Sequence, residues 1–135
     1  LVAKYLDIVG LTKYKSYYPK QLSSSMLQRV SIARAFATEP ELLLMDEPYG
    51  QLDIELRFKL EDELVKLWEM TGTTVIFITH NIEEAVYLGQ RIMILTNKPT
   101  TVKRTVNNTL PRPRDIASPD FVALRTEVTD AIKWW

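Results

Sequence analysis

Two short apolar runs, each followed at once by polar residues, constrain the fold of this chain more than any other feature. The first run is Leu42 to Met45 and the second is Thr74 to Thr79. Each run is too short for a helix and too apolar for an exposed strand, which predicts strands covered on both faces, as in parallel sheets. A stretch with helical periodicity separates them. The chain is therefore predicted to be an α/β protein with a mostly parallel sheet.

Helices are predicted wherever apolar residues recur three or four positions apart. These stretches are 2–9, 26–38, 56–71 and 82–88, with Gly10, Pro40 and Gly72 as stop signals. A third strand is expected at 91–96 and an edge strand at 101–106. Ser118 and Pro119 are the expected start of a terminal helix. Before it, the basic residues Arg104, Arg112 and Arg114 are interpreted as part of a solvated linker.

Composition excludes several classes of function. Lys and Arg total 17 and Asp and Glu total 17, so no net charge favours a nucleic acid or an anionic membrane. The absence of cysteine excludes disulfides, thiolate zinc sites and thiol catalysis, and it agrees with a cytosolic location. No apolar run approaches the roughly 20 residues that cross a bilayer. Any partner must therefore be recognised by a local site.

Two acidic residues follow the first apolar run, and a histidine ends the second. Asp46 and Glu47 come directly after Met45, and His80 comes directly after Thr79. The C-terminal ends of parallel strands meet at one edge of a sheet, where α/β proteins bind ligands. Acids in a turn are often merely solvated, and a lone histidine is more often structural than catalytic. Because both features would share one edge, we interpret them as a candidate active site.

Four motifs in a fixed order add to this interpretation. They are LSSSMLQRVSIARAF, LLLMDEP, GQLD and ITHN, which lie between Leu22 and Asn81. Their order and separations closely resemble the C-terminal portion of the ATP-binding subunit of an ABC transporter. The resemblance implies a partial P-loop NTPase-type domain with flanking helices. It implies the end of a helical subdomain at 1–40, the C-terminal part of the ATPase core at 41–106, and a linker with a C-terminal helix at 107–135.

The resemblance also implies a role for each matching residue. Asp46 would hold Mg²⁺, Glu47 would be the general base for the attacking water, and His80 would contact the γ-phosphate of ATP. Phosphoryl transfer depends mainly on positioning and charge neutralisation, which such groups supply. The segment Gln51–Asp53 matches a loop at the dimer interface. The residues expected near the nucleotide are Ser23, Ser24, Ser25, Gln28 and Asp53.

Partners and location are implied in the same way. Segments such as YPKQL and EEAVYLGQRIMIL look most like the importer branch for nitrate, sulfonate, taurine and bicarbonate. A complete subunit of that kind would dimerise head to tail and bind two Mg-ATP molecules. It would drive a transmembrane permease from the cytoplasmic face of the cell membrane. A permease-facing surface is expected within residues 2–20, and no nucleic-acid partner is expected.

The phosphate-binding loop that this chemistry needs is missing. The motif G-x-x-x-x-G-K-[ST] surrounds phosphates with glycine N–H groups and a lysine. The glycines here are Gly10, Gly50, Gly72 and Gly89, and none of them precedes a lysine. The chain, which starts at Leu1, is therefore expected to be the C-terminal half of a longer subunit. By itself it is expected neither to bind ATP tightly nor to hydrolyse it.

The segment LSSSM has serines where the family has two glycines. Ser24 and Ser25 each add a Cβ where backbone must approach a phosphate, so contact with ATP held by the opposite subunit is expected to weaken. A helix-capping role is also open, since Ser25 and Gln28 have the spacing of a capping box.

Two other classes of function stay open. One is a non-catalytic relic or interaction module of ABC ATPase origin, which the missing phosphate loop favours. The other is a chromosome-maintenance or DNA-repair ATPase, which shares these motifs but joins its halves by a long coiled coil. In that class, heptad repeats should lead directly into the LSSSM segment. Residues 1–21 instead predict one short helix, interrupted by Gly10 and Pro19.

Overall fold

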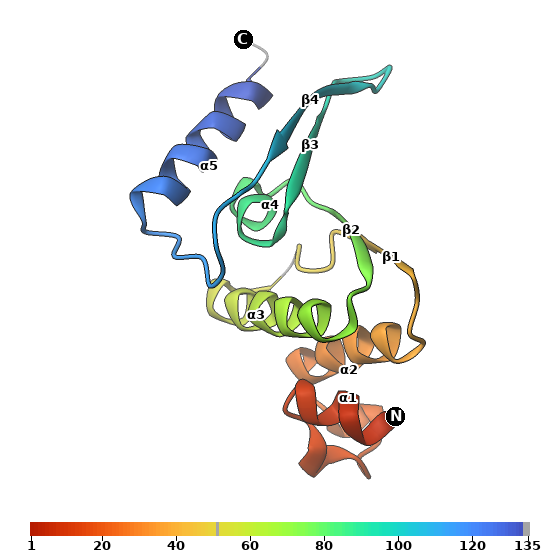
Figure 1. The fold of residues 1–135 in the computed structure, drawn as a ribbon. Coiled ribbons are helices and arrows are strands. Elements are labelled where there is room, and N and C mark those ends of the chain that lie inside the picture. Colours follow the sequence, from red (N-terminus) through yellow and green to blue (C-terminus); the bar gives the residue numbers. More distant parts are fainter. Residues whose placement is uncertain (51, 134–135) are drawn as a thin grey trace. The chain divides into compact units, whose positions relative to one another are not determined.

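The computed structural model describes residues 1–50 and 52–133, which form two compact units (Figure 1). The units divide between Ile78 and Thr79, and each is described by itself. The expectations that concern Gln51, Trp134 and Trp135 lie outside the described residues. Within residues 1–50 and 52–133, no helix combines the length and apolar character needed to cross a membrane.

The first unit contains three helices, two 3-10 turns and two strands. Their bounds are α1 Val2–Ile8, η1 Thr12–Tyr14, η2 Pro19–Gln21, α2 Ser24–Ala37, β1 Leu42–Asp46, α3 Ile54–Thr71 and β2 Thr74–Ile78. Gly10 and Gly72 follow α1 and α3 with φ of 67° and 65°, the left-handed conformation that glycine adopts without steric cost. Two of the three predicted stop signals, Gly10 and Gly72, are therefore confirmed.

The strands β1 and β2 pair in parallel, as predicted. Their register runs from Leu42 opposite Thr74 to Asp46 opposite Ile78. Equal lengths and this register bring the two C-terminal ends to the same edge of the pair. The predicted edge for ligand chemistry therefore exists within the first unit.

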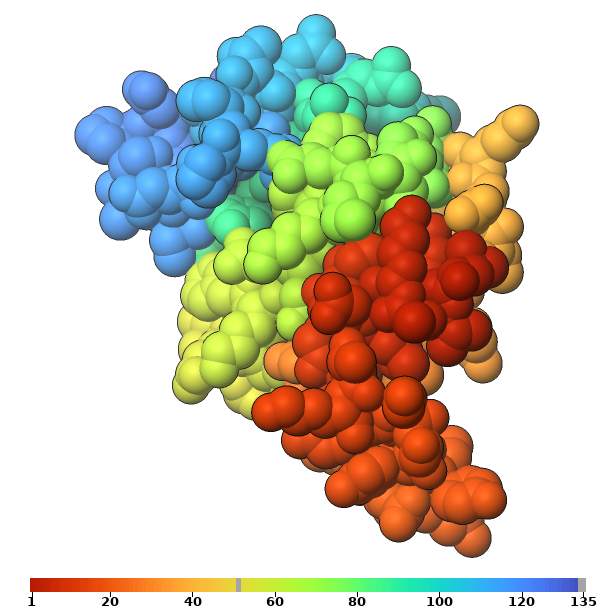
Figure 2. Space-filling view, turned by 60° about the horizontal axis from the view of Figure 1, so that its bottom comes forward, coloured from red at the N-terminus to blue at the C-terminus, as the bar shows by residue number. Residues whose placement is uncertain are grey.

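The helices of the first unit bury one common core. Figure 2 shows α1, in red, lying directly against the green α3, and α1 also contacts α2. Its buried apolar side chains come from all three helices and the α1–η1 turn: Tyr5, Val9, Leu11, Ile32, Ala33, Phe36, Leu60, Leu64 and Leu67. The leucine spacing in α3 therefore forms the buried stripe expected from the sequence.

One face of the β1–β2 pair is exposed, contrary to the prediction that both faces are covered. Leu42, Leu44, Ile76 and Ile78 are 51%, 66%, 49% and 52% exposed. Alternate residues of a strand point to opposite faces, and Met45, on the other face, is buried. The sequence shows that both faces of the strand pair are apolar. It does not show which neighbouring segments cover each face, so the exposed face could not be predicted from it.

The second unit consists of α4 Ile82–Leu88, β3 Arg91–Leu95, β4 Val102–Asn107 and α5 Pro119–Ile132. Strands β3 and β4 form an antiparallel hairpin (Figure 1), a pairing separate from that of β1 with β2. This differs from a mostly parallel sheet, because the short Asn97–Pro99 turn folds β4 back onto β3. Ser118 caps α5 by accepting from the N–H of Phe121 at 3.2 Å, and Pro119 is its first residue, as predicted.

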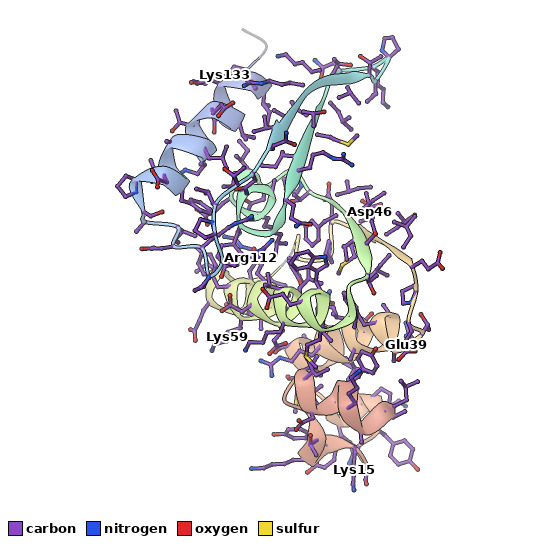
Figure 3. The ribbon with its side chains drawn as sticks, in the orientation of Figure 1. Lys15, Glu39, Asp46, Lys59, Arg112 and Lys133 are labelled. Atoms are coloured by element: carbon purple, nitrogen blue, oxygen red, sulfur yellow. The ribbon has the colours of Figure 1, made fainter. Side chains whose placement is uncertain are left out.

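Arg112 and Arg114 bind the end of α4, so the interpretation that they belong to a solvated linker is wrong for these two arginines. The guanidinium of Arg114, only 8% exposed, donates from Nη1 to the carbonyls of Val86 (2.9 Å), Tyr87 (2.8 Å) and Gly89 (2.9 Å). Arg112, labelled in Figure 3, donates to Tyr87 at 3.1 Å and to Leu88 at 2.5 Å.

Asn108 completes this arrangement with bonds of 2.7 and 2.9 Å to the carbonyls of Val86 and Gly89. The last carbonyls of a helix have no partner within the helix, and cationic side chains stabilise them. Arg104 lies elsewhere and pairs with Glu127 of α5. Burial lowers the pKa of Arg114 to about 10, and the neighbouring positive charge of Arg112 adds to this shift.

Candidate functional site

The turn after β1 has a strained backbone at Glu47. Asp46 ends β1 and is exposed at the strand's C-terminal end (Figure 3), and Glu47 follows with φ of 43°. Positive φ is unfavourable for any residue with a Cβ and persists only where the surroundings impose it. The N–H of Glu47 donates to the carbonyl of Ile78 at 2.8 Å, which ties the turn to the end of β2.

Two further anchors hold this turn. The amide of Gln28, from α2, donates to the carbonyl of Pro48 at 2.8 Å. Tyr49 is 2% exposed, its hydroxyl donates to the carbonyl of Leu60 in α3 at 3.2 Å, and its ring lies 5.6 Å from that of Phe77. The backbone around Glu47 is thus fixed by β2, α2 and α3 together, a rigid support of the kind that positions catalytic groups.

The three serines lie at the N-terminus of α2, a 14-residue helix that begins at Ser24. Ser23 is the N-cap, and its Oγ accepts from the N–H of Met26 at 3.3 Å. The predicted capping box of Ser25 with Gln28 is therefore wrong, because Gln28 binds Pro48 and the helix begins two residues earlier.

Ser24 and Ser25 have no positive φ, so their Cβ atoms cause no backbone strain in this conformation. The hydroxyl of Ser23 caps the helix through a lone pair and keeps its proton available to donate. A helix N-terminus presents N–H groups and a positive dipole, which suits an anionic group. The observed geometry is therefore compatible with the predicted phosphate contact, which stays a prediction.

His80 lies between the end of β2 and the start of α4. It follows Ile78 by two residues, and Ile78 is the register partner of Asp46. The flanking residues Thr79 and Asn81 are both fixed by hydrogen bonds. That the imidazole joins the carboxylates of Asp46 and Glu47 around a nucleotide stays a prediction.

Asp53 has a structural role that explains its position. Its Oδ1 accepts from the N–H of Leu56 at 2.9 Å and caps α3. Aspartate is among the residues preferred at this position, and such a cap stabilises a helix by about 1 kcal/mol. The predicted role of Asp53 at a dimer interface stays a prediction.

The ion pair of Arg29 with Glu63 was missed by the sequence analysis. It joins α2 to α3, with 3.4 Å between Nε of Arg29 and Oε1 of Glu63. Burial raises the pKa of Glu63, and the positive charge of Arg29 partly opposes this shift. No local pattern joins two residues so far apart in sequence, so only the packing of the two helices reveals the pair.

One residue at the β1–β2 edge, Asp46, has the chemistry to hold Mg²⁺, one of the two groups that the resemblance implies. Mg²⁺ prefers carboxylate oxygen and is usually held by one or two carboxylates together with water and substrate phosphate. Asp46 offers one exposed carboxylate in this setting. Among residues 1–50 and 52–133, no three His, Asp or Glu side chains gather as a metal-binding cluster.

Comparison with known proteins agrees with the motif pattern. A family model described as ABC transporter matches residues 2–50, which end with the Glu47 turn. An uncharacterized ABC transporter ATP-binding protein of Methanocaldococcus jannaschii is 43% identical over 133 residues, covering 98% of this chain and 50% of that protein. The aliphatic sulfonates import ATP-binding protein SsuB of Bacillus anthracis is 44% identical over 127 residues, covering 94% and 51%. The chain thus spans about half the length of these relatives.

Solved structures show the same fold. A structure described as an inward-facing ABC transporter of the metal-chelate type matches with a TM-score of 0.68 and 25% identity, covering 93% of this chain and 48% of that chain. The ADP conformation of an ATP-binding cassette matches with a TM-score of 0.62 and 22% identity, covering 68% and 36%. The likeness extends over about half or less of each solved chain.

Proposed function

We propose that this chain, an α/β partial ABC ATPase domain that corresponds to part of an ABC transporter ATP-binding protein, supplies the carboxylate edge for Mg-ATP hydrolysis. The observation that carries the proposal is the turn at Glu47, which is held in a strained conformation beside Asp46 at the C-terminal edge of a parallel pair. Strained residues in α/β proteins gather at functional sites, and ligands bind at this edge.

Each residue of the site has a distinct task in this proposal. Asp46 would hold Mg²⁺, which neutralises phosphate charge when it is bound. Glu47 would accept a hydrogen bond from the attacking water and orient it, and His80 would donate a hydrogen bond to the γ-phosphate. Ser23 at the start of α2 would donate to the γ-phosphate of a nucleotide bound by a second subunit. Asp53 would lie near that subunit.

The isolated chain should not hydrolyse ATP. Its sequence contains no G-x-x-x-x-G-K-[ST] loop. It therefore lacks both the glycine N–H groups and the motif lysine that would bind the β- and γ-phosphates. Asp46 and Glu47 alone present negative charge to an anionic nucleotide. Hydrolysis would need a polypeptide that brings the phosphate loop to the β1–β2 edge.

The solute class and partners are proposed from the relatives. The SsuB relative is described as importing aliphatic sulfonates, which supports an importer of a sulfonate or another small oxyanion. The working assembly would be a head-to-tail pair of ATP-binding subunits on a transmembrane permease, at the cytoplasmic face of the membrane.

A second candidate is a non-catalytic interaction module of the same origin. Ser24 and Ser25, in place of two glycines, favour it because each hydroxymethyl group occupies space beside the helix N-terminus. This candidate predicts that no arrangement of the chain with a phosphate loop restores hydrolysis.

A chimera tests the choice between the two candidates. A polypeptide segment that carries a G-x-x-x-x-G-K-[ST] phosphate loop, taken from an ABC ATP-binding subunit, is fused to Leu1 of this chain. We expect Mg-dependent ATP hydrolysis that Glu47→Gln abolishes. Glu39→Gln is the matched control, because Glu39 also has positive φ, 50°, but lies before β1. A folded, ATP-binding chimera with no turnover would refute catalysis in favour of the interaction module. Turnover that is indifferent to Glu47→Gln would refute the role of Glu47.

A further inference from the structure

The three residues between β2 and α4 form a hydrogen-bonded turn with His80 at its centre. The hydroxyl of Thr79 accepts from the N–H of Asn81 at 2.9 Å, so this bond spans His80. A threonine hydroxyl that bonds to the backbone two residues ahead makes a local turn. The backbone of His80 therefore belongs to a small closed ring.

A buried carboxylate sets the direction of this bond. Oε2 of Glu84 accepts from the hydroxyl of Thr79 at 2.5 Å, and Glu84 is only 5% exposed. A hydroxyl has one proton and two lone pairs, and the backbone N–H of Asn81 can only donate, so it uses a lone pair of Thr79. The proton of Thr79 is thus directed to Glu84, and a lone pair remains for the N–H of Asn81.

Glu84 also holds the other neighbour of His80. The Oδ1 of Asn81 accepts from the N–H groups of Glu83 at 2.9 Å and Glu84 at 3.3 Å. Asn81 is therefore bound through its side chain to the backbone of Glu84 and through its own N–H to Thr79. Both residues that flank His80 are linked to Glu84, one by its carboxylate and the other by its backbone.

We propose that Glu84 is a positioning residue for His80, acting through Thr79 and Asn81. The contact of His80 with a γ-phosphate rests on the proposed function, whereas the fixing of its backbone does not. Glu84 touches neither nucleotide nor reacting atoms in this scheme. Its carboxylate keeps the hydroxyl of Thr79 oriented, and the oriented hydroxyl keeps the ring around His80 closed.

The chain offers a direct measurement, because it contains a single histidine. Labelling with ¹⁵N-histidine gives one backbone amide and one imidazole, both from His80, and uniform labelling reports the amide of Asn81. We expect Glu84→Ala to speed exchange of the Asn81 amide about tenfold, as expected for loss of one hydrogen bond to a charged group. The His80 signals should shift and broaden in the same variant.

Four further variants separate positioning from general destabilisation. Glu84→Gln keeps an oxygen that can accept from Thr79 and should restore most of the protection. Glu83→Gln removes a neighbouring charge from the same helix turn and should leave the His80 signals unchanged. Thr79→Val is nearly isosteric and removes the acceptor of the Asn81 N–H itself, so it gives the full loss of protection with which the Glu84 variants are compared. Glu84→Leu, which keeps an apolar side chain in the buried position, provides the test if Glu84→Ala does not fold.

The proposal is overturned if Asn81 stays protected in folded Glu84→Ala or in folded Glu84→Leu. It is also overturned if Glu83→Gln changes the His80 signals as much as Glu84→Ala does. None of these measurements requires ATP. An inactive chimera combined with the expected spectra would reject the proposed function alone, and an active chimera with unchanged spectra would reject only the role of Glu84.

Discussion

Replacing Glu47 by glycine should stabilise the first unit, although glycine usually destabilises a folded protein. A residue with a Cβ pays about 1–2 kcal/mol to adopt the left-handed conformation. Glycine avoids that cost but loses about 0.5–1 kcal/mol of extra backbone entropy on folding. Because Glu47 has φ of 43°, the free energy of unfolding should be about 0.5–1 kcal/mol higher for Glu47→Gly than for Glu47→Ala.

Two control positions make the comparison specific. Glu39, with φ of 50°, should show the same preference for glycine over alanine. Glu69 is exposed within α3, where glycine should be about 0.5–1 kcal/mol less stable than alanine. Glycine should therefore be more stable than alanine at positions 39 and 47 but less stable at position 69. A general effect of glycine would have the same sign at all three positions.

Urea unfolding followed by the fluorescence of Trp68 measures these differences. The background carries Trp134→Phe and Trp135→Phe, so that Trp68, in α3 of the first unit, is the only fluorescent tryptophan. The reasoning is refuted if glycine at position 47 is less stable than alanine by the amount seen at position 69. In the chimera, Glu47→Gly should lose hydrolysis while gaining stability, and Glu39→Gly should gain stability alone.

Three other changes have defined outcomes. Arg114→Met should lower the unfolding free energy of the second unit by about 2–3 kcal/mol, seen as faster amide exchange in α4; an unchanged rate would contradict this. Because burial raises the pKa of Glu63 above 4.5, its contribution to stability falls as pH rises through that raised value. Glu63→Gln should flatten that slope in urea midpoints measured across this range, and an equally steep slope would show another cause. Ser24→Gly combined with Ser25→Gly should destabilise α2 by about 0.5–1 kcal/mol per glycine but increase ATP turnover in the chimera. Unchanged turnover would show that the two serines do not weaken the contact of the LSSSM segment with ATP.

Element positions were predictable because local signals agree with the tertiary structure. The helix at 82–88 has the predicted bounds, and Gly72 and Ser118 end and begin helices as expected. Among three adjacent serines, however, cap propensity is nearly equal, so it could not select Ser23 over Ser25. The tertiary bond of Gln28 to Pro48 shows that Gln28 is not available for a capping box with Ser25.

The geometry of the candidate site was predictable only in part. The parallel pairing that places Asp46 at an edge followed from two apolar runs separated by a helix. The positive φ of Glu47 has a partial signal, since the residue before Pro48 avoids the right-handed helical region. That signal does not distinguish the left-handed conformation from the extended conformations that are also open to a residue before proline.

Long-range polar contacts had no signal in the sequence. The arginines at 112 and 114 bind carbonyls 24 to 28 residues earlier, and their proline-rich surroundings suggested a solvated segment instead. The bond of Thr79 to Glu84 is different, because a threonine before a helix and an acid in its first turn are a recognisable local pattern.

The proposed function requires His80 to lie near the carboxylate edge, and a spin label tests this requirement most directly. The chain has no cysteine, so Glu47→Cys and Glu39→Cys each give one labelling site, near opposite ends of β1 (Figure 3). A strand of this length spans about 16 Å, which separates the two labels clearly. The proposed site predicts strong relaxation of the single ¹⁵N-histidine signal by the label at 47 and weak relaxation by the label at 39. Equal relaxation from both labels, or stronger relaxation from position 39, would contradict a shared catalytic edge.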